Sequence, residues 1–124
     1  MNPPPAPAPQ FLILLHQPHG EGPGPTPAEL QQIMAKFGAW MKSLNDRGHL
    51  LSSHGLETTG KVLRLPGAAS MTDGPYVEAR EIVGGYILIS ADSLDHATEI
   101  ARGCPGLDHR LAVEVRPIRT RPPA

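Results

Sequence analysis

"TPAELQQIMAKFGAWMKSLNDRG", residues 26–48, carries the signals of one long amphipathic helix. Thr26-Pro27-Ala28-Glu29 offers an N-cap hydroxyl, a proline at the first helical position and a glutamate at the third. Large apolar residues then recur at steps of three and four, which places them on one helical face. They are Leu30, Ile33, Met34, Phe37, Trp40, Met41 and Leu44. Arg47-Gly48 supplies a terminal cation and a left-handed stop. The pattern predicts a helix over about 27–47 whose aromatic and methionine side chains pack in the core.

Short apolar runs of the kind that form buried strands lie on both sides of this helix. They are "FLILLH" (11–16), "HLLSSHGLE" (49–57), "KVLRL" (61–65), "YILIS" (86–90) and "LAVEVRPI" (111–118). Gly84-Gly85, before the fourth run, predicts a β-bulge or a close backbone approach. Asp92-Ser93 caps a second helix, which Gly103 and Pro105 end. The order βαββαβ predicts an α+β fold with both helices on one face of an antiparallel sheet.

The strand sequences also predict self-association. "FLILL" and "YILI" are apolar at both odd and even positions, so both faces of the sheet require burial. Two helices cover only one face. A second copy of the same sheet is the economical cover for the other, and we therefore expect a symmetric homodimer joined through sheet faces.

Composition narrows the class of protein. The 124 residues suit one domain, at 11–118, between proline-rich or loose tails at 1–10 and 119–124. Eleven Lys and Arg balance twelve Asp and Glu with no basic stripe, so we expect no nucleic-acid partner. The apolar runs are too short to span a membrane. A single cysteine, Cys104, together with the absence of a secretory signal pattern, favours the cytoplasm.

Asp73-Gly74-Pro75 predicts a tight polar turn shortly before a buried strand. The Asp73 carboxylate could bond nearby backbone amides, as turn aspartates do. It could instead act as a base at the mouth of a pocket, which requires desolvation or neighbouring carboxylates to raise its pKa. Glu78 and Glu81 could supply that effect, whereas Arg80 would oppose it.

Histidines supply further candidates. His16 ends the first strand and His109 precedes the last, so either could face the pocket of Asp73. His16 and His19 lack a third ligand, and we predict no metal site. Ser53 and His54 are adjacent on one strand, so they point to opposite faces and cannot form a nucleophile–base couple.

The remaining histidines, His49 and His96, are expected to face solvent at the edges of a helix and a strand. Cys104 follows a helix C-terminus, which disfavours a thiolate, so it is not expected to be a nucleophile.

Residues 72–118 carry a recognisable series of motifs. These are Asp73-Gly74-Pro75-Tyr76, Glu78-Ala79-Arg80-Glu81, Gly84-Gly85-Tyr86 and the final "VEVRP" at 113–117. In this order they resemble the YCII-related family, in particular its DGPF branch, and the first helix with Trp40 is similar too. The resemblance implies a ferredoxin-like domain that dimerises through its sheets into an α/β-barrel assembly.

The same resemblance gives a partial view of function. Some YCII-like relatives are lyases acting on chlorinated aromatic rings, with a histidine–aspartate pair implicated. The family histidine lies in the first turn of the first helix, where this chain has Glu29. The family's Asp-x-Gly is present as Asp46-Arg47-Gly48, and Asp108-His109-Arg110 stands where relatives often have glycines.

Two functional hypotheses follow. The first is a small-molecule enzyme, without metal or organic cofactor, that abstracts a proton with loss of a leaving group. Asp73 would be the base, His16 or His109 its partner, and Tyr76 a hydrogen-bonding group. The other candidate ligand-binding residues are Glu78, Arg80, Ser53 and His54. The second hypothesis is a non-catalytic dimeric module that binds a protein or a metabolite.

Overall fold

The computed structural model describes residues 8–19, 22–64, 71–74 and 80–120, with only the backbone of 71–74. Its elements, in chain order, are β1 (Gln10–Pro18), α1 (Pro27–Asp46), β2 (Leu50–Gly55), β3 (Gly60–Leu63), β4 (Met71–Gly74), β5 (Glu81–Ser90), α2 (Leu94–Ala101), a 3-10 helix η1 (Pro105–His109) and β6 (Ala112–Pro117). Each predicted helix and strand is present, and β1 already begins at Gln10, within the predicted tail. Most of both predicted tails lies outside the described residues.

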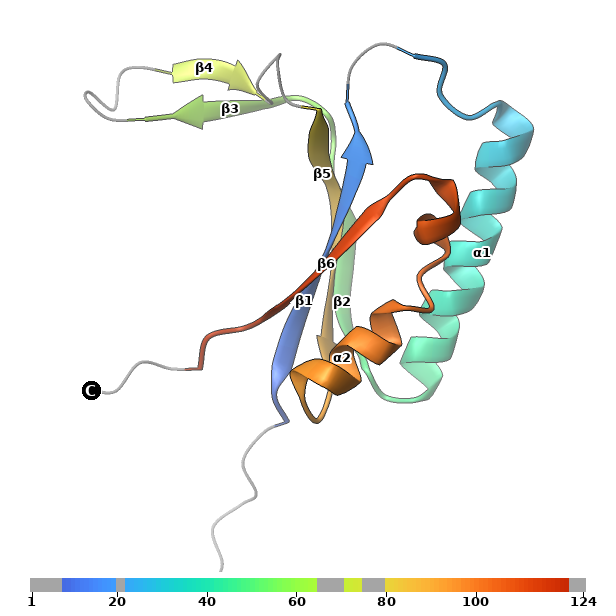
Figure 1. Cartoon of the computed structure of the whole chain (residues 1–124), viewed down its shortest axis with the longest axis vertical. Helices are drawn as coiled ribbons and strands as arrows, with labels where there is room; N and C mark the ends of the chain where they lie inside the picture. The colour runs from blue at the N-terminus through green and yellow to red at the C-terminus, as the bar shows by residue number, and fades with distance from the viewer. Residues whose placement is uncertain (1–7, 20–21, 65–70, 75–79, 121–124) are drawn as a thin grey trace, which may run out of the picture.

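Four strands form an antiparallel sheet in the order β2-β5-β1-β6, which confirms an α+β fold. Figure 1 shows α1 and α2 on the same side of this sheet. The third predicted strand differs from expectation in its pairing: β3 joins β4 in a separate two-stranded sheet. In the described chain the main sheet therefore has a helix-covered face and a helix-free face.

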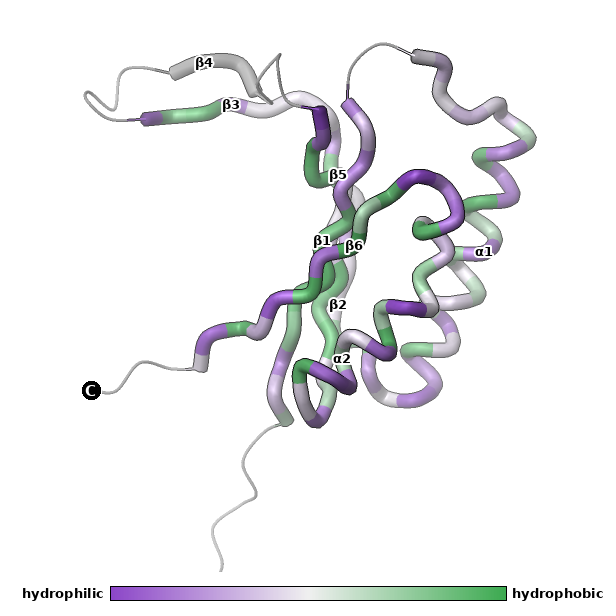
Figure 2. Tube along the Cα trace, in the orientation of Figure 1, coloured by the Kyte–Doolittle hydropathy of each residue, from purple (hydrophilic) through white to green (hydrophobic). Residues whose placement is uncertain are grey.

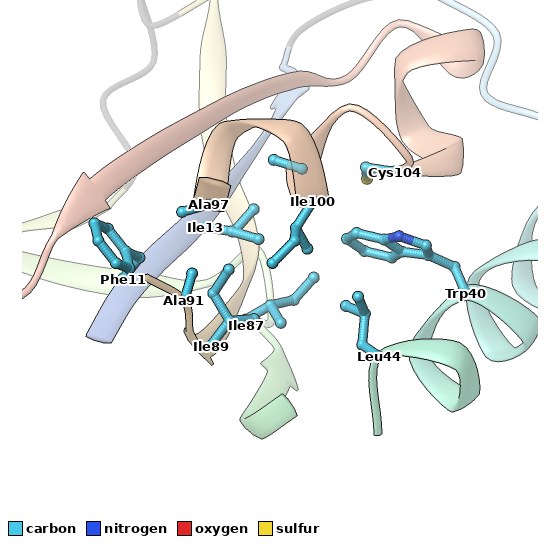
Figure 3. Packing of buried hydrophobic residues seen from close by; sticks show 11 residues of the cluster. Phe11, Ile13, Trp40, Leu44, Ile87, Ile89, Ala91, Ala97, Ile100 and Cys104 are labelled. Atoms are coloured by element: carbon cyan, nitrogen blue, oxygen red, sulfur yellow. The ribbon is translucent and has the colours of Figure 1, made fainter. Parts of the chain in front are cut away.

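The core lies between the sheet and the helices (Figure 3). Phe11 and Ile13 of β1 and Ile87 and Ile89 of β5 meet side chains of both helices. The helical side chains are Trp40 and Leu44 of α1 and Ala97, Ile100 and Ala101 of α2. Burial of every second residue in β5 follows from the two-residue repeat of a strand. Figure 2 shows long hydrophobic stretches along the central strands, whereas hydrophobic and hydrophilic residues alternate along the turns of α1.

Local signals define α1 as predicted. The Thr26 hydroxyl accepts a hydrogen bond from the Glu29 amide at 3.1 Å, which completes the N-cap. Gly48 has a φ of 78°, the left-handed conformation that ends the helix. The predicted burial of the whole apolar stripe is wrong at its start, because Leu30 is 49% and Met34 63% exposed. The second helix α2 is short and packs beside β1 and β6, so it leaves the first turns of α1 uncovered.

The prediction for Gly84-Gly85 is confirmed. The β1–β5 register shifts after the pair Leu15 and Gly85, so that His16 lies opposite Val83 and Gly84 forms a bulge. Gly85 also permits close approach of β2, since an added Cβ there would lie 3.1 Å from the His54 carbonyl oxygen.

Candidate functional site

The helix-free face of the main sheet carries both apolar and polar side chains. Because Ile13, Ile87 and Val115 belong to the core side, their neighbours along each strand point away from the helices. Cross-strand partners share a face, which extends the assignment to β2. We call the following residues the helix-free face: Leu12, Leu14, His16, Ser52, His54, Val83, Tyr86, Leu88, Ala112, Glu114 and Arg116.

A histidine–carboxylate pair lies on this face. His16 of β1 and Glu114 of β6 are joined by a bond of 2.8 Å between Nε2 and Oε1. Their side chains are 25% and 45% exposed, and the Arg116 Nε lies 3.9 Å from the other Glu114 oxygen. Because a carboxylate accepts, the His16 Nε2 donates in this bond, and in the neutral imidazole the lone pair is then on Nδ1. This is the arrangement in which a carboxylate orients an imidazole for proton transfer.

A histidine–tyrosine pair lies on the same face. The His54 Nδ1 and the Tyr86 hydroxyl are 2.8 Å apart, and their rings are tilted by 42° with centroids 5.6 Å apart. His54 is exposed on β2, and Tyr86 is partly buried on the central strand β5. The pair can present an imidazole N–H and a phenol oxygen to a bound molecule.

Strand register places the two pairs close together. Tyr86 lies opposite Leu14 on β1, and His16 is two residues farther along that strand. Diagonal neighbours of this kind are about 7–8 Å apart in an antiparallel sheet. One small molecule could therefore contact both pairs, with Leu14 and Val83 as an apolar floor.

Asp73 lies outside this sheet. Asp73 and Gly74 belong to strand β4, where Asp73 pairs with Lys61 and Gly74 with Gly60, and Pro75 of the predicted turn lies outside the described residues. Asp73 therefore lies close to the Gly60 end of the β3–β4 hairpin, the end that follows β2 in the chain.

Of the other predicted ligand-binding residues, only Arg80, Ser53 and His54 belong to the described part of the chain. Tyr76 and Glu78 lie outside the described residues. Arg80 is exposed, and its carbonyl accepts a 2.8 Å bond from the His19 amide. Ser53 lies opposite the core residue Ile87, on the face that His54 does not share, so the predicted separation of these two side chains is confirmed.

His109 is on the helix side of the molecule. It ends η1, which packs against α1 and β6. Its Nε2 is buried, and no hydrogen-bond partner is present among the described residues. His16 and His109 therefore lie on opposite sides of the sheet, and a single site in one chain does not bring them together.

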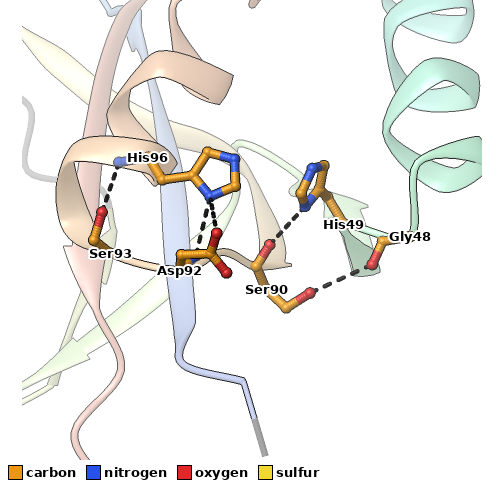
Figure 4. Close-up of polar contacts among 6 residues, drawn as sticks. All are labelled: Gly48, His49, Ser90, Asp92, Ser93 and His96. Atoms are coloured by element: carbon orange, nitrogen blue, oxygen red, sulfur yellow. Dashed lines mark hydrogen bonds and ion pairs between the residues drawn. The ribbon is translucent and has the colours of Figure 1, made fainter.

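His49 and His96, which were expected to face solvent, are partly buried and in edge contact, with 5.2 Å between their ring centroids. Figure 4 shows how backbone groups hold both rings. The Nδ1 of His49 bonds the Ser90 carbonyl at 3.0 Å, and the Nδ1 of His96 accepts from the Asp92 amide at 3.0 Å. The first bond joins the residue before β2 to the end of β5, and the second holds the His96 ring against the chain just before α2. The ring contact links the two, so both histidines have a structural role.

Metal-binding groups, a reactive cysteine and membrane-spanning helices are the other features to consider in the described chain. No group of three or more His, Cys, Asp or Glu side chains there is arranged to hold a metal ion. Burial raises the pKa of the Cys104 thiol, although hydrogen bonds from the backbone of Gly106 and Leu107 act in the opposite direction. No helix within the described ranges is both long and apolar enough to cross a membrane.

Comparison with known proteins gives one assignment. No curated protein matches the chain. The family model for the YCII-related domain matches residues 10–120, from the start of β1 to just beyond β6. The match includes both polar pairs of the helix-free face and the whole core. The chain therefore belongs to the YCII-related family.

Proposed function

We propose that this protein is a cofactor-independent enzyme of the lyase type, acting on a small molecule bound at the helix-free face. The observation that carries the proposal is the 2.8 Å bond between His16 and Glu114. Glu114 orients the imidazole by accepting a hydrogen bond from its Nε2, and Nδ1 of His16 takes the proton.

The reaction we propose is an elimination. His16 removes a proton from a carbon next to a carbonyl group. The electron pair of the broken C–H bond forms a C=C bond, and the leaving group departs from the neighbouring carbon with the electrons of its own bond. The Tyr86 hydroxyl or the His54 ring would hydrogen-bond the substrate oxygen on which negative charge develops. Asp73 remains a second candidate for the base, because it lies at the Gly60 end of the β3–β4 hairpin, which follows β2.

A second copy of the chain completes the site in this proposal. An antiparallel sheet with one solvated face usually alternates apolar and polar residues. The helix-free face instead places Leu12, Leu14, Val83 and Leu88 side by side on β1 and β5. A homodimer joined through these faces would bury them and leave the polar pairs at its seam.

The finer family features belong to the same proposal. The strand order β2-β5-β1-β6, with β3 and β4 set apart, supports a ferredoxin-like domain that pairs into an α/β-barrel. The sequence Asp73-Gly74-Pro75-Tyr76 supports membership of the DGPF branch. A compartment with reduced thiols, such as the cytoplasm, suits the single cysteine.

One observation favours the alternative, a non-catalytic dimeric module. His54 and Tyr86 satisfy each other at 2.8 Å, as polar groups do when they have a structural role. In that case the face would bind a metabolite without turnover.

The test uses the purified full chain and a panel of small β-chloro carbonyl compounds, which carry the C–H bond and the leaving group that the proposed elimination requires. Binding is measured by thermal shift and turnover by release of chloride. We expect His16→Asn to lower turnover by roughly 10²–10⁴-fold while the thermal shift remains, because the variant loses the base and keeps the apolar floor. His19→Asn, in the loop after β1, is the matched control and should retain full turnover.

The outcomes separate the hypotheses. Equal turnover in His16→Asn and the unaltered protein would exclude His16 as the base. Thermal shift without chloride release from any compound would support the binding module instead.

A further inference from the structure

The hairpin formed by β3 and β4 stands apart from the rest of the domain. We call residues 60–63 and 71–74 the β-arm. Its strands pair from Gly60 opposite Gly74 at the base to Leu63 opposite Met71 at the far end. Among the described elements, the two strands pack on each other and on no other helix or strand to a comparable degree. Figure 1 shows the β-arm leaving the sheet on the side opposite α1.

Such a hairpin needs a contact that its own described chain does not supply. A two-stranded hairpin alone is at best marginally stable in water. The β-arm also holds an apolar side chain outward, because Leu63, toward its far end, is 58% exposed. Burying a leucine of this kind would stabilise both the hairpin and whatever it contacts.

The length of the β-arm matches the distance to a second sheet. Four residues of strand span about 13 Å at roughly 3.3 Å per residue, and sheets packed face to face lie about 10 Å apart. A copy seated on the helix-free face would stand on the side toward which the β-arm projects. The β-arm is therefore long enough to cross the seam and reach the body of that copy.

We propose that the β-arm is a dimerisation clasp, in which Leu63 of each chain packs against the second copy. This rests on the proposed pairing of helix-free faces. In an isologous pair the two β-arms would close on the partner chains symmetrically, at the same end of the sheet as His16 and Val83. The β-arm would then also form one wall of the proposed site.

The first test compares Leu63→Asp with Leu30→Asp by sedimentation equilibrium. Leu30 is a matched control because it is 49% exposed but lies on α1, on the other side of the sheet. We expect Leu63→Asp to raise the dimer dissociation constant by about tenfold or more, since it replaces a buried leucine by a charge. Leu30→Asp should leave it unchanged. Equal dissociation constants for the unaltered chain and Leu63→Asp would overturn the proposal.

The second test needs no substitution. Backbone amides of residues 60–63 should exchange slowly with deuterium in the dimer and quickly after dilution to monomer. Fast exchange at every concentration, or slow exchange in the monomer, would overturn the clasp. A chain that stays monomeric at every concentration refutes the second copy itself. Dimers insensitive to Leu63→Asp refute only the clasp, and the turnover of His16→Asn tests the chemistry separately.

Discussion

Alanine substitutions at two adjacent residues of β1, Leu12 and Ile13, should distinguish the environments of the two faces of the sheet. Ile13 is completely buried against the helices, whereas Leu12 lies on the helix-free face and keeps part of its surface in solvent. Substitution by alanine removes the same three carbon atoms at either position. The pair therefore compares the environments of the two faces at constant chemistry.

The expected cost at Ile13 is large. Removing three buried carbons loses about 2.4 kcal/mol of transfer free energy, and the residual cavity brings the total to about 2–5 kcal/mol. If the helix-free face is uncovered, Leu12→Ala should lower the free energy of unfolding by only about 1–2 kcal/mol, because a site that borders solvent leaves no closed cavity. If a second copy covers the face, Leu12→Ala should cost as much free energy as Ile13→Ala, and this cost would appear as weaker association of the two chains.

Urea unfolding measures both effects through the fluorescence of Trp40, the single tryptophan of the chain, which is 9% exposed in the core. The unfolding midpoint should rise with protein concentration for the unaltered chain and for Ile13→Ala, as it does for a dimer. Leu12→Ala should reduce this dependence. A loss below about 1 kcal/mol for Ile13→Ala would refute the assigned core. Midpoints independent of concentration in all three proteins would refute the covered face.

Two further predictions concern single positions. Gly48→Ala should lower the free energy of unfolding by about 1 kcal/mol in the same urea assay, because alanine is strained at a φ of 78°. No atom lies within 4 Å of the new Cβ, so the cost comes from the backbone alone. An unchanged free energy would show that α1 does not depend on this stop. Burial raises the pKa of the Cys104 thiol, so a disulfide reagent at pH 8 should label the folded protein far more slowly than the urea-unfolded chain, and equal rates would contradict this burial. Because the folded pKa is the higher one, the contribution of Cys104 to stability is complete below the unfolded value of about 8.5 and is lost as pH rises through the folded value.

The parts of the fold that could be predicted depend on local chemistry. The helix α1 follows from its cap at Thr26, its repeat of three and four, and Gly48. The bulge at Gly84 follows from a diglycine beside an apolar strand. The pairing of β3 with β4, by contrast, depends on which edges meet in three dimensions, and a short apolar run does not encode its partner. The exposure of Met34 could not be predicted for the same reason. A helical repeat of apolar residues indicates which face of α1 is apolar, but it does not indicate how far a second helix covers that face.

The candidate site likewise combines a residue that local sequence could identify with a partner that only the three-dimensional pairing of strands reveals. His16 was identified as a strand-end histidine, but its partner Glu114 lies 98 residues away in the sequence. Only the register between β1 and β6 brings the two together. One available signal was the alternation "VEV" at 113–115, which assigns Glu114 to the face opposite Val113 and Val115. The position of His109 follows from the short helix η1, which packs against α1 and which no pattern in the sequence predicted.

The bulge at Gly84 connects the fold to the site. On β5 the even-numbered residues Tyr86 and Leu88 face away from the helices, whereas the extra residue Gly84 reverses this alternation toward the start of the strand. Ile82 is consequently buried on the helix side, and Val83 lies on the helix-free face opposite His16. Without the bulge, the position opposite His16 would be a glycine and the apolar floor between the two polar pairs would end at Leu14. One inserted glycine thus extends the apolar surface to the end of the sheet where the pairs lie, which is why we expect ligand and partner to meet the chain there.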